Sequence, residues 1–169
     1  MIRRGLCNGG LVVVLLATAF RLGGIRVNAS ESLPLGLYRT TSDTAAILVE
    51  FCPSGPYAKL SANRDYRGEG NCPDGAEPLM KPIVAVPGDV VQVSPRGVAV
   101  NGRLLPNSAP RLFDTKNRPL HHWPLGIYRV SPGSVWVVSS FNDRSFDSRY
   151  FGPIRTSSIR HHLRPLITE

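Results

Sequence analysis

The stretch LMKPIVAVPGDVVQVSPRGVAVNGRLL, residues 79–105, decides the fold class of this chain. Its short apolar runs are separated by a Pro-Gly-Asp turn and by Asn101-Gly102. Asn-Gly between apolar runs is the strongest short-range signal for a hairpin with a two-residue type I′ turn. We therefore predict strands at residues 79–89 and 89–94, and a hairpin over residues 97–105 that turns at Asn101-Gly102.

The flanking sequence continues the same pattern. We predict strands at 44–51 and 133–141, and a polar loop at 142–154 that turns back into an apolar strand. Residues 107–126 show no period and indicate an extended excursion, and the tail from residue 155 is expected to hold one short strand or to stay loose. Fifteen prolines and sixteen glycines disfavour long helices. The predicted fold class is mostly β, with antiparallel strands and little helix.

The composition limits the classes of partner. A chain of 169 residues that is 42% hydrophobic can bury the core of one domain. Its formal charge is +8, yet the basic residues are scattered and aromatic residues make up only 8%. We therefore expect no nucleic-acid partner, and favour a basic domain held near an anionic membrane surface.

The N-terminal residues MIRRGLCNGGLVVVLLATAF carry two arginines ahead of an apolar run. This order is typical of a signal peptide or a short signal anchor. We assign residues 1–26 to that segment and residues 27–169 to an exported domain. Ala17-Thr18-Ala19 resembles a small-residue cleavage site, so retention and removal of the segment both stay open.

Two of the three cysteines fall in the exported domain. Cys7 lies in the apolar segment, whereas Cys52 and Cys72 bracket a loop rich in Pro, Gly and Asn. A cysteine pair in an exported domain predicts a disulfide, and the alternative is two free buried thiols. The spacing that zinc sites require is absent, so we expect no metal ion.

The motif Pro-Leu-Gly-(Leu/Ile)-Tyr-Arg occurs twice, at 34–39 and 124–129, but only the first copy follows serines, Ser30 and Ser32. A serine before such a turn can present its hydroxyl on a rigid corner, although most serines in turns only bond the backbone. We interpret the second copy as a turn into a strand. The histidines that precede it, His121 and His122, are expected to be exposed and without a catalytic role.

Lys81 stands out because the chain has seventeen arginines and only three lysines. A lysine on the inward face of a strand has a lowered pKa and can act as a neutral general base. The alternative is a lysine that extends into solvent from a sheet edge, which Pro82 favours.

The segment SFDSRYFGP, residues 145–153, supplies further candidates. Ser145 could hydrogen bond the amine of Lys81, and Asp147 could form an internal ion pair with Arg149. The alternative is a surface loop in which an exposed pair contributes less than about 1 kcal/mol.

Four stretches together resemble the type I signal peptidase superfamily of Ser-Lys proteases, and they occur in that family's order. The segment at 145–153 is the most specific of them. Leu33 after the serine, where general signal peptidases usually have Met, and the PLGLYR motif favour the TraF-type branch of conjugative-transfer peptidases. The matching stretches are residues 30–34, 79–89, 101–105 and 145–153.

This resemblance implies a role for each matched residue. Ser32 would be the nucleophile and Lys81 its general base, and no cofactor would be needed. The Ser30 hydroxyl and the Ser32 backbone N–H would form the oxyanion hole. Ser145 would orient Lys81, and Asp147 with Arg149 would brace the site. Two departures are Pro82, where the family more often has Arg, and FNDRS at 141–145 in place of a Gly-Asp-Asn-Arg start.

The resemblance further implies a signal-peptidase-like β domain that faces the periplasm from the bacterial inner membrane, or is free there if the leader is removed. Its expected function is that of a serine endopeptidase that matures a conjugative propilin by C-terminal trimming, with or without head-to-tail cyclisation. One alternative is a general signal peptidase that acts on other exported precursors. A second is a non-catalytic structural component of the transfer apparatus.

Overall fold

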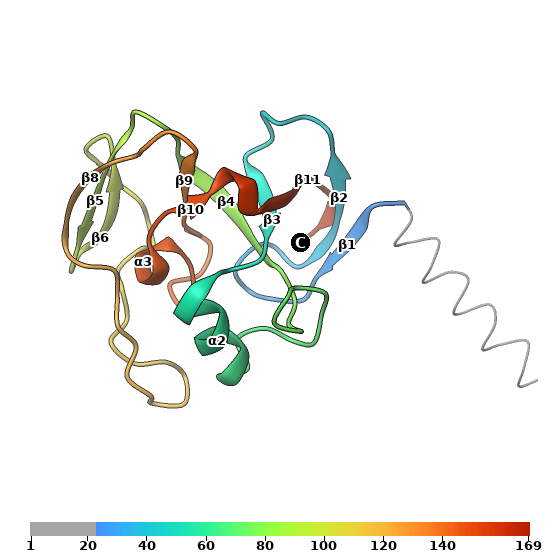
Figure 1. Ribbon diagram of the computed structural model, residues 1–169, viewed down its shortest axis with the longest axis horizontal. Coiled ribbons are helices and arrows are strands. Elements are labelled where there is room, and N and C mark those ends of the chain that lie inside the picture. The colour runs from blue at the N-terminus through green and yellow to red at the C-terminus, as the bar shows by residue number, and fades with distance from the viewer. Residues whose placement is uncertain (1–22) are drawn as a thin grey trace, which may run out of the picture.

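The computed structural model describes residues 23–169, which form two antiparallel sheets with short helices at their margins (Figure 1). The prediction of a mostly β, antiparallel fold is confirmed. The larger sheet has the strand order β1 (Ile25–Asn28), β2 (Gly36–Thr41), β11 (Ile159–Thr168), β3 (Leu48–Phe51), β4 (Leu79–Ala85), β9 (Ser134–Val137), β10 (Ile154–Arg155). The smaller sheet has the order β7 (Arg103–Leu104), β6 (Gly97–Val100), β5 (Val90–Ser94), β8 (Gly126–Arg129).

The hairpin predicted from Asn101-Gly102 is present. Asn101 has a φ of 49° and Gly102 a φ of 82°, so both central residues have the positive φ that a type I′ turn requires. The turn joins β6 to β7, in which Val100 pairs with Arg103. The apolar runs around it form β4, β5 and β6 as expected.

β4 is an interior strand, which rules out a sheet-edge position for Lys81. It pairs with β3 on one side and β9 on the other. Pro82 fits because its carbonyl accepts from Val138 at 3.2 Å, and the amide of Ile83 donates to Ile47 at 2.7 Å. The register to β9 shifts between Ile83 and Ala85, and such irregularities are where sheets tolerate proline.

The C-terminal tail and the disulfide loop differ from the predictions. The tail forms β11, a ten-residue strand that pairs with both β2 and β3, so the expectation of a short or loose tail is wrong. Leu163 is the only buried residue of β11. The strand therefore lacks the alternation of buried apolar and exposed polar residues that would predict it from the sequence. The disulfide loop contains helix α2 (Gly55–Asn63), whose buried positions are the small residues Ala58 and Ser61. Tyr57 and Leu60 of this helix pack against the core but are only partly buried, so the apolar face is too short for a sequence pattern to reveal.

The core has two clusters, and β9 belongs to both. Val135 and Val137 pack in the cluster of the large sheet, whereas Trp136 and Val138 pack in the cluster of the small sheet. Successive side chains of a strand point to opposite faces, so one buried strand joins the two clusters. Helix α3 (Ser148–Phe151) adds Tyr150 and Phe151 to the first cluster.

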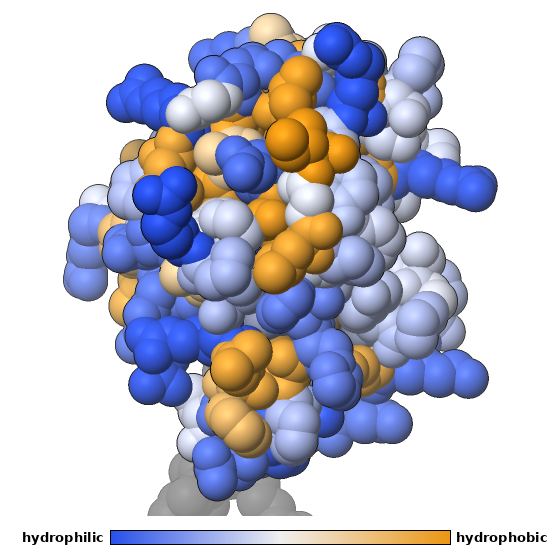
Figure 2. All heavy atoms as spheres, turned by 90° about the vertical axis from the view of Figure 1, so that its left-hand side faces the viewer, coloured by the Kyte–Doolittle hydropathy of each residue, from blue (hydrophilic) through white to orange (hydrophobic). Residues whose placement is uncertain are grey.

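The outer face of the small sheet is largely open to solvent. Ile127 of β8 and Leu104 of β7 are 72% and 50% exposed, in a cross-strand row with Gln92 and Ala99. Figure 2 looks at the side of the molecule where β5, β6 and β8 lie, and it shows hydrophobic residues interspersed with hydrophilic ones.

The pairing of β1 with β2 extends to the N-terminal side of residue 27, where we placed the start of the exported domain. Ile25 and Arg26 pair with Arg39 and Tyr38 of β2. The predicted leader and Cys7 lie outside the described residues. Within residues 23–169, no helix combines the length and the apolar character needed to cross a membrane.

Candidate active site

Ser32 lies in the loop between β1 and β2, and a buried asparagine fixes that loop. The side-chain amide of Asn28, at the end of β1, donates to the carbonyls of Ser30, Leu33 and Pro34 at 2.9, 3.1 and 3.0 Å. Asn28 is only 4% exposed. The sequence analysis missed this residue. The one sequence signal that could have indicated Asn28 is its place before a turn, because Asn side chains commonly hydrogen bond the backbone of a following turn.

The two copies of the Pro-Leu-Gly motif form the same local structure. The hydroxyl of Tyr38 donates to the carbonyl of Pro34 at 2.7 Å, and that of Tyr128 donates to the carbonyl of Pro124 at 2.6 Å. Each motif leads into a strand, β2 in the first copy and β8 in the second. The prediction that the second copy is a turn into a strand is confirmed.

Ser32 and Lys81 line one cavity of about 1250 Å³, together with Ser30. The cavity is bounded by β1, the serine loop, the start of β4 and the segment that precedes β4. The structure thus brings the predicted nucleophile and the predicted base to the same cavity, although they are 49 residues apart in the sequence.

Lys81 is buried on the core side of β4. It pairs with Val49 and shares its face with Leu79, and its exposed fraction is 2%. Burial lowers the pKa of Lys81 from 10.5 to about 8; the charge of Asp147 opposes this shift and that of Arg149 adds to it. A substantial fraction of the lysine is therefore neutral at mildly alkaline pH, as a general base must be.

Ser145 is buried beside the candidate nucleophile. Its hydroxyl lies 3.4 Å from the Ser32 hydroxyl, at the outer limit of a hydrogen bond. Among the described residues it makes no hydrogen bond to Lys81, so the predicted orienting contact is replaced here by a contact to Ser32. Ser30 is exposed, and its hydroxyl donates to the side-chain oxygen of Asn28 at 2.9 Å.

Asp147 and Arg149 form an ion pair that is wholly buried. Two guanidinium nitrogens of Arg149 lie 2.8 and 2.9 Å from the two carboxylate oxygens of Asp147, and neither side chain is exposed. The guanidinium also donates to the carbonyls of Asn107, Asp143 and Ser139. All five of its donors thus have partners, so this segment is an internal brace and not the surface loop of the alternative interpretation.

A short chain of contacts links this brace to the serine loop. One carboxylate oxygen of Asp147 accepts from the Ser139 amide at 2.9 Å, and the Ser139 hydroxyl donates to the carbonyl of Ser32. Ser139 is fully buried. The sequence analysis missed it because it appeared only as part of the strand predicted at 133–141.

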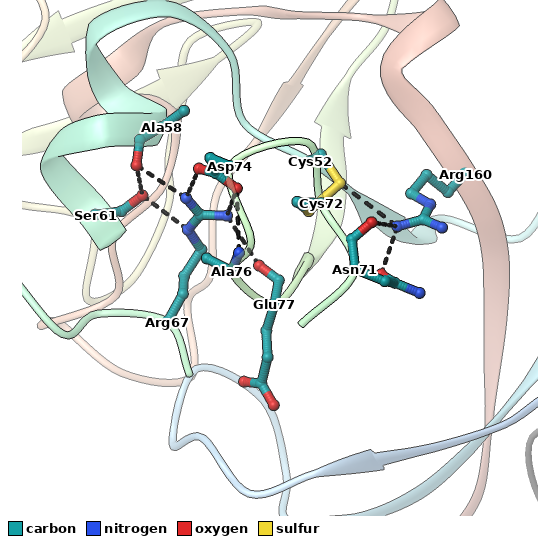
Figure 3. The surroundings of a disulfide bond; sticks show 10 residues. All are labelled: Cys52, Ala58, Ser61, Arg67, Asn71, Cys72, Asp74, Ala76, Glu77 and Arg160. Carbon is teal, nitrogen blue, oxygen red and sulfur yellow. Dashed lines mark hydrogen bonds and ion pairs between the residues drawn. A yellow bond between two sulfur atoms is a disulfide. The ribbon is translucent and has the colours of Figure 1, made fainter. Parts of the chain in front are cut away.

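Cys52 and Cys72 are joined by a disulfide, as predicted (Figure 3). The loop that it closes contributes Tyr66, Arg67, Glu69, Gly70 and Asn71 to the cavity wall. No group of three or more metal-binding side chains occurs in the part of the chain that the structure describes.

A sequence model of the family described as signal peptidase, peptidase S26, matches residues 10–164. This chain belongs to that family. Membership supports a peptidase of the serine type, and a matched region that spans both sheets agrees with the signal-peptidase-like fold expected from the sequence.

Full-length relatives carry names from conjugation. A plasmid transfer protein TraF of Escherichia coli is 39% identical over 99% of this chain and 96% of its own length. A probable conjugal transfer protein TraF of Sinorhizobium fredii is 38% identical over 97% and 88%, and a conjugal transfer protein TraF of Agrobacterium fabrum is 34% identical over 94% and 91%. These similarities confirm the resemblance to TraF-type signal peptidases.

Among solved structures, a signal peptidase I from Enterococcus faecalis V583 is similar. It is 17% identical, covers 74% of this chain and 99% of its own, and has a TM-score of 0.39.

Proposed function

We propose that this chain is a membrane-associated serine endopeptidase that uses Ser32 and Lys81 to mature a conjugative propilin by trimming its C-terminal end. The observation that carries the proposal is a wholly buried lysine of lowered pKa in the same cavity as a serine held on a braced loop. The names of the full-length relatives support a role in conjugal transfer.

In the proposed reaction, neutral Lys81 accepts the proton of Ser32 as the serine oxygen attacks the scissile carbonyl. The Ser32 backbone N–H and the Ser30 hydroxyl, once rotated away from Asn28, stabilise the oxyanion. Loss of one such donor typically costs about 10²–10³ in rate. Protonated Lys81 then donates to the leaving amine, which leaves an acyl-enzyme on Ser32.

Two nucleophiles could accept the acyl group from Ser32, namely water and the N-terminal amine of the substrate. Water gives a linear product, whereas the substrate's own N-terminal amine gives a ring and expels the serine oxygen without using water. In both cases Lys81 takes the proton of the attacking group and returns it to Ser32.

The proposed setting is the bacterial inner membrane, with the β domain on the periplasmic side. The Cys52–Cys72 disulfide supports an oxidising compartment, and the charge of +8 suits an anionic membrane surface. A general signal peptidase is the second candidate, because the matched family carries that description.

The test is mass spectrometry of the candidate propilin from the same transfer system, co-expressed with the wild type, Ser32→Ala, Lys81→Ala or the control Lys59→Ala. Lys59 lies exposed on α2. We expect the wild type and the control to trim the propilin, and both site variants to leave it intact. A product lighter by one water than the linear form would identify a ring.

Two other outcomes point elsewhere. Trimming by both site variants would contradict the dyad and favour a structural component of the transfer apparatus. If the wild type leaves the propilin intact but cleaves signal-peptide precursors, the result would favour a general signal peptidase.

A further inference from the structure

One wall of the cavity is a small hairpin, residues 68–77, which we call the rim hairpin. Glu69, Gly70, Asn71 and Glu77 of this hairpin line the cavity. Four backbone hydrogen bonds close it: Gly70 N–H to Gly75 O at 2.9 Å, Cys72 N–H to Ala76 O at 3.0 Å, Gly75 N–H to Cys72 O at 2.8 Å and Glu77 N–H to Gly68 O at 2.8 Å.

The rim hairpin has little apolar support of its own. Within it only Cys72 and Ala76 are buried, and all other residues are exposed. Segments with few buried apolar contacts open easily unless other bonds restrain them. Its position against the cavity therefore depends on its tethers.

The first tether is the disulfide. Cys52 follows Phe51, the last residue of β3, and Phe51 pairs with Leu79 of β4 while Val49 pairs with Lys81. The rim hairpin leads directly into β4 through Pro78. The disulfide thus fastens the hairpin to the same strand pair that holds the candidate base.

Two arginines supply the remaining tethers and approach the hairpin from different sides (Figure 3). Arg160 of β11 donates to the side-chain oxygen of Asn71 at 2.6 Å and to its carbonyl at 3.3 Å. Arg67 is paired with Asp74 and donates to the carbonyl of Glu77 at 3.0 Å and to that of Ala58 on α2 at 2.8 Å.

We propose that the Cys52–Cys72 disulfide and Arg160 are positioning elements for the peptide substrate. They hold the rim hairpin as a preformed wall, so that binding does not have to order it. Their loss raises KM and leaves the chemistry at Ser32 and Lys81 unchanged. This inference rests on the proposed peptidase function and adds that peptide affinity depends on the oxidation state of the pair.

Reduction of the Cys52–Cys72 disulfide removes this tether reversibly. A thiolate of dithiothreitol attacks one sulfur of the pair and forms a mixed disulfide. Its second thiol then closes the reagent into a cyclic disulfide and releases Cys52 and Cys72 as two thiols. Reoxidation restores the wall.

The test uses the full chain in detergent and compares a Cys52→Ser/Cys72→Ser double variant, Arg160→Ala and the matched control Arg164→Ala. Arg164 is also an exposed arginine of β11, but its partner is Asp43, away from the rim hairpin. KM and kcat are measured on the purified propilin, and hydrogen exchange follows the amides of Gly70, Cys72 and Glu77.

We expect a KM about tenfold higher for the double variant, because substrate binding must then order the hairpin. Arg160→Ala should give a rise of about threefold, and Arg164→Ala none. In both rim variants kcat and the pH midpoint of kcat/KM should be unchanged, and the three hairpin amides should exchange faster. The amides of β4 and β9 should exchange at the wild-type rate in Arg160→Ala, and in the double variant they should be accelerated less than the hairpin amides, because loss of the disulfide also lowers the global free energy of unfolding. Dithiothreitol should reproduce the double variant in the wild type.

Faster hairpin exchange with an unchanged KM would overturn the proposal, as would a fall in kcat with a shifted pH midpoint. Failure of the proposed function is a different result, in which the wild type leaves the propilin intact. The same KM comparison is then made with a signal-peptide precursor, and the rise in KM for the rim variants decides the inference on that substrate.

Discussion

Lys81 carries the pH dependence expected of this enzyme at the scale of a single residue. Burial lowers its pKa to about 8, and only the neutral amine can accept the Ser32 proton. We predict that kcat/KM rises as the pH increases through about 8 and falls about tenfold per pH unit below that value. Initial rates on the propilin across this range measure the profile, and a flat profile would argue against Lys81 as the base.

The burial of Lys81 should also lower the free energy of unfolding. Because the pKa of Lys81 falls from 10.5 to about 8, the unfolded chain binds more protons than the folded chain between these values. The free energy of unfolding therefore rises with pH in this window, and below it the folded protein carries a penalty of about 3 kcal/mol.

Replacing Lys81 with Met removes that penalty. We predict that Lys81→Met is inactive and yet more stable than the wild type at neutral pH, by up to about 3 kcal/mol. The gain should fade as the pH rises from about 8 towards 10.5. Urea unfolding at several pH values measures it, with the exposed Lys59→Met as control. A gain that is independent of pH would mean that packing, and not charge burial, is responsible.

Ser139 connects two elements of the site, since it joins the Asp147 brace to the backbone of Ser32. We predict that Ser139→Ala lowers kcat about five- to tenfold, because the serine loop loses a hydrogen bond that fixes it. Ser140→Ala is the neighbouring control and should be neutral. Single-turnover kinetics with the propilin separate this loss from binding. A change confined to KM would show that Ser139 supports the wall of the cavity instead.

At the scale of elements, local signals located the hairpin at Asn101-Gly102 but not every strand. Asn101-Gly102 predicted its turn because positive φ at both positions is a local requirement. β11 and α2 were missed because tertiary contacts stabilise them: β11 lies between β2 and β3, and α2 sits in the disulfide loop with only small buried residues. Neither element shows a clear apolar period.

The residues of the candidate site also fall into two groups, those that the sequence analysis predicted and those that it missed. Ser32, Lys81, Asp147 and Arg149 were predicted because a family resemblance includes side chains whose type matters. Asn28 and Ser139 were missed because they bind backbone atoms of the serine loop. Contacts of that kind depend on where the chain runs in space, which the spacing of residue types does not reveal.

The arrangement of the whole molecule predicts how it unfolds. β9 places Val137 in the cluster of the large sheet and Trp136 in that of the small sheet, and both side chains are buried. Neither sheet can separate from the other without exposing this strand. We therefore predict one cooperative unfolding transition for the domain and not two.

Trp136 reports this transition once Trp123→Phe has removed the other tryptophan. Its fluorescence senses the small-sheet cluster, whereas far-UV circular dichroism averages over both sheets, so the two thermal curves should coincide. Reduction of the Cys52–Cys72 disulfide, whose loop has a sequence separation of 20, should lower the midpoint of both curves together, because removing the cross-link destabilises the folded domain by about 3 kcal/mol. A fluorescence change that precedes the loss of circular dichroism would show that the small sheet melts first, and that β9 does not couple the two clusters.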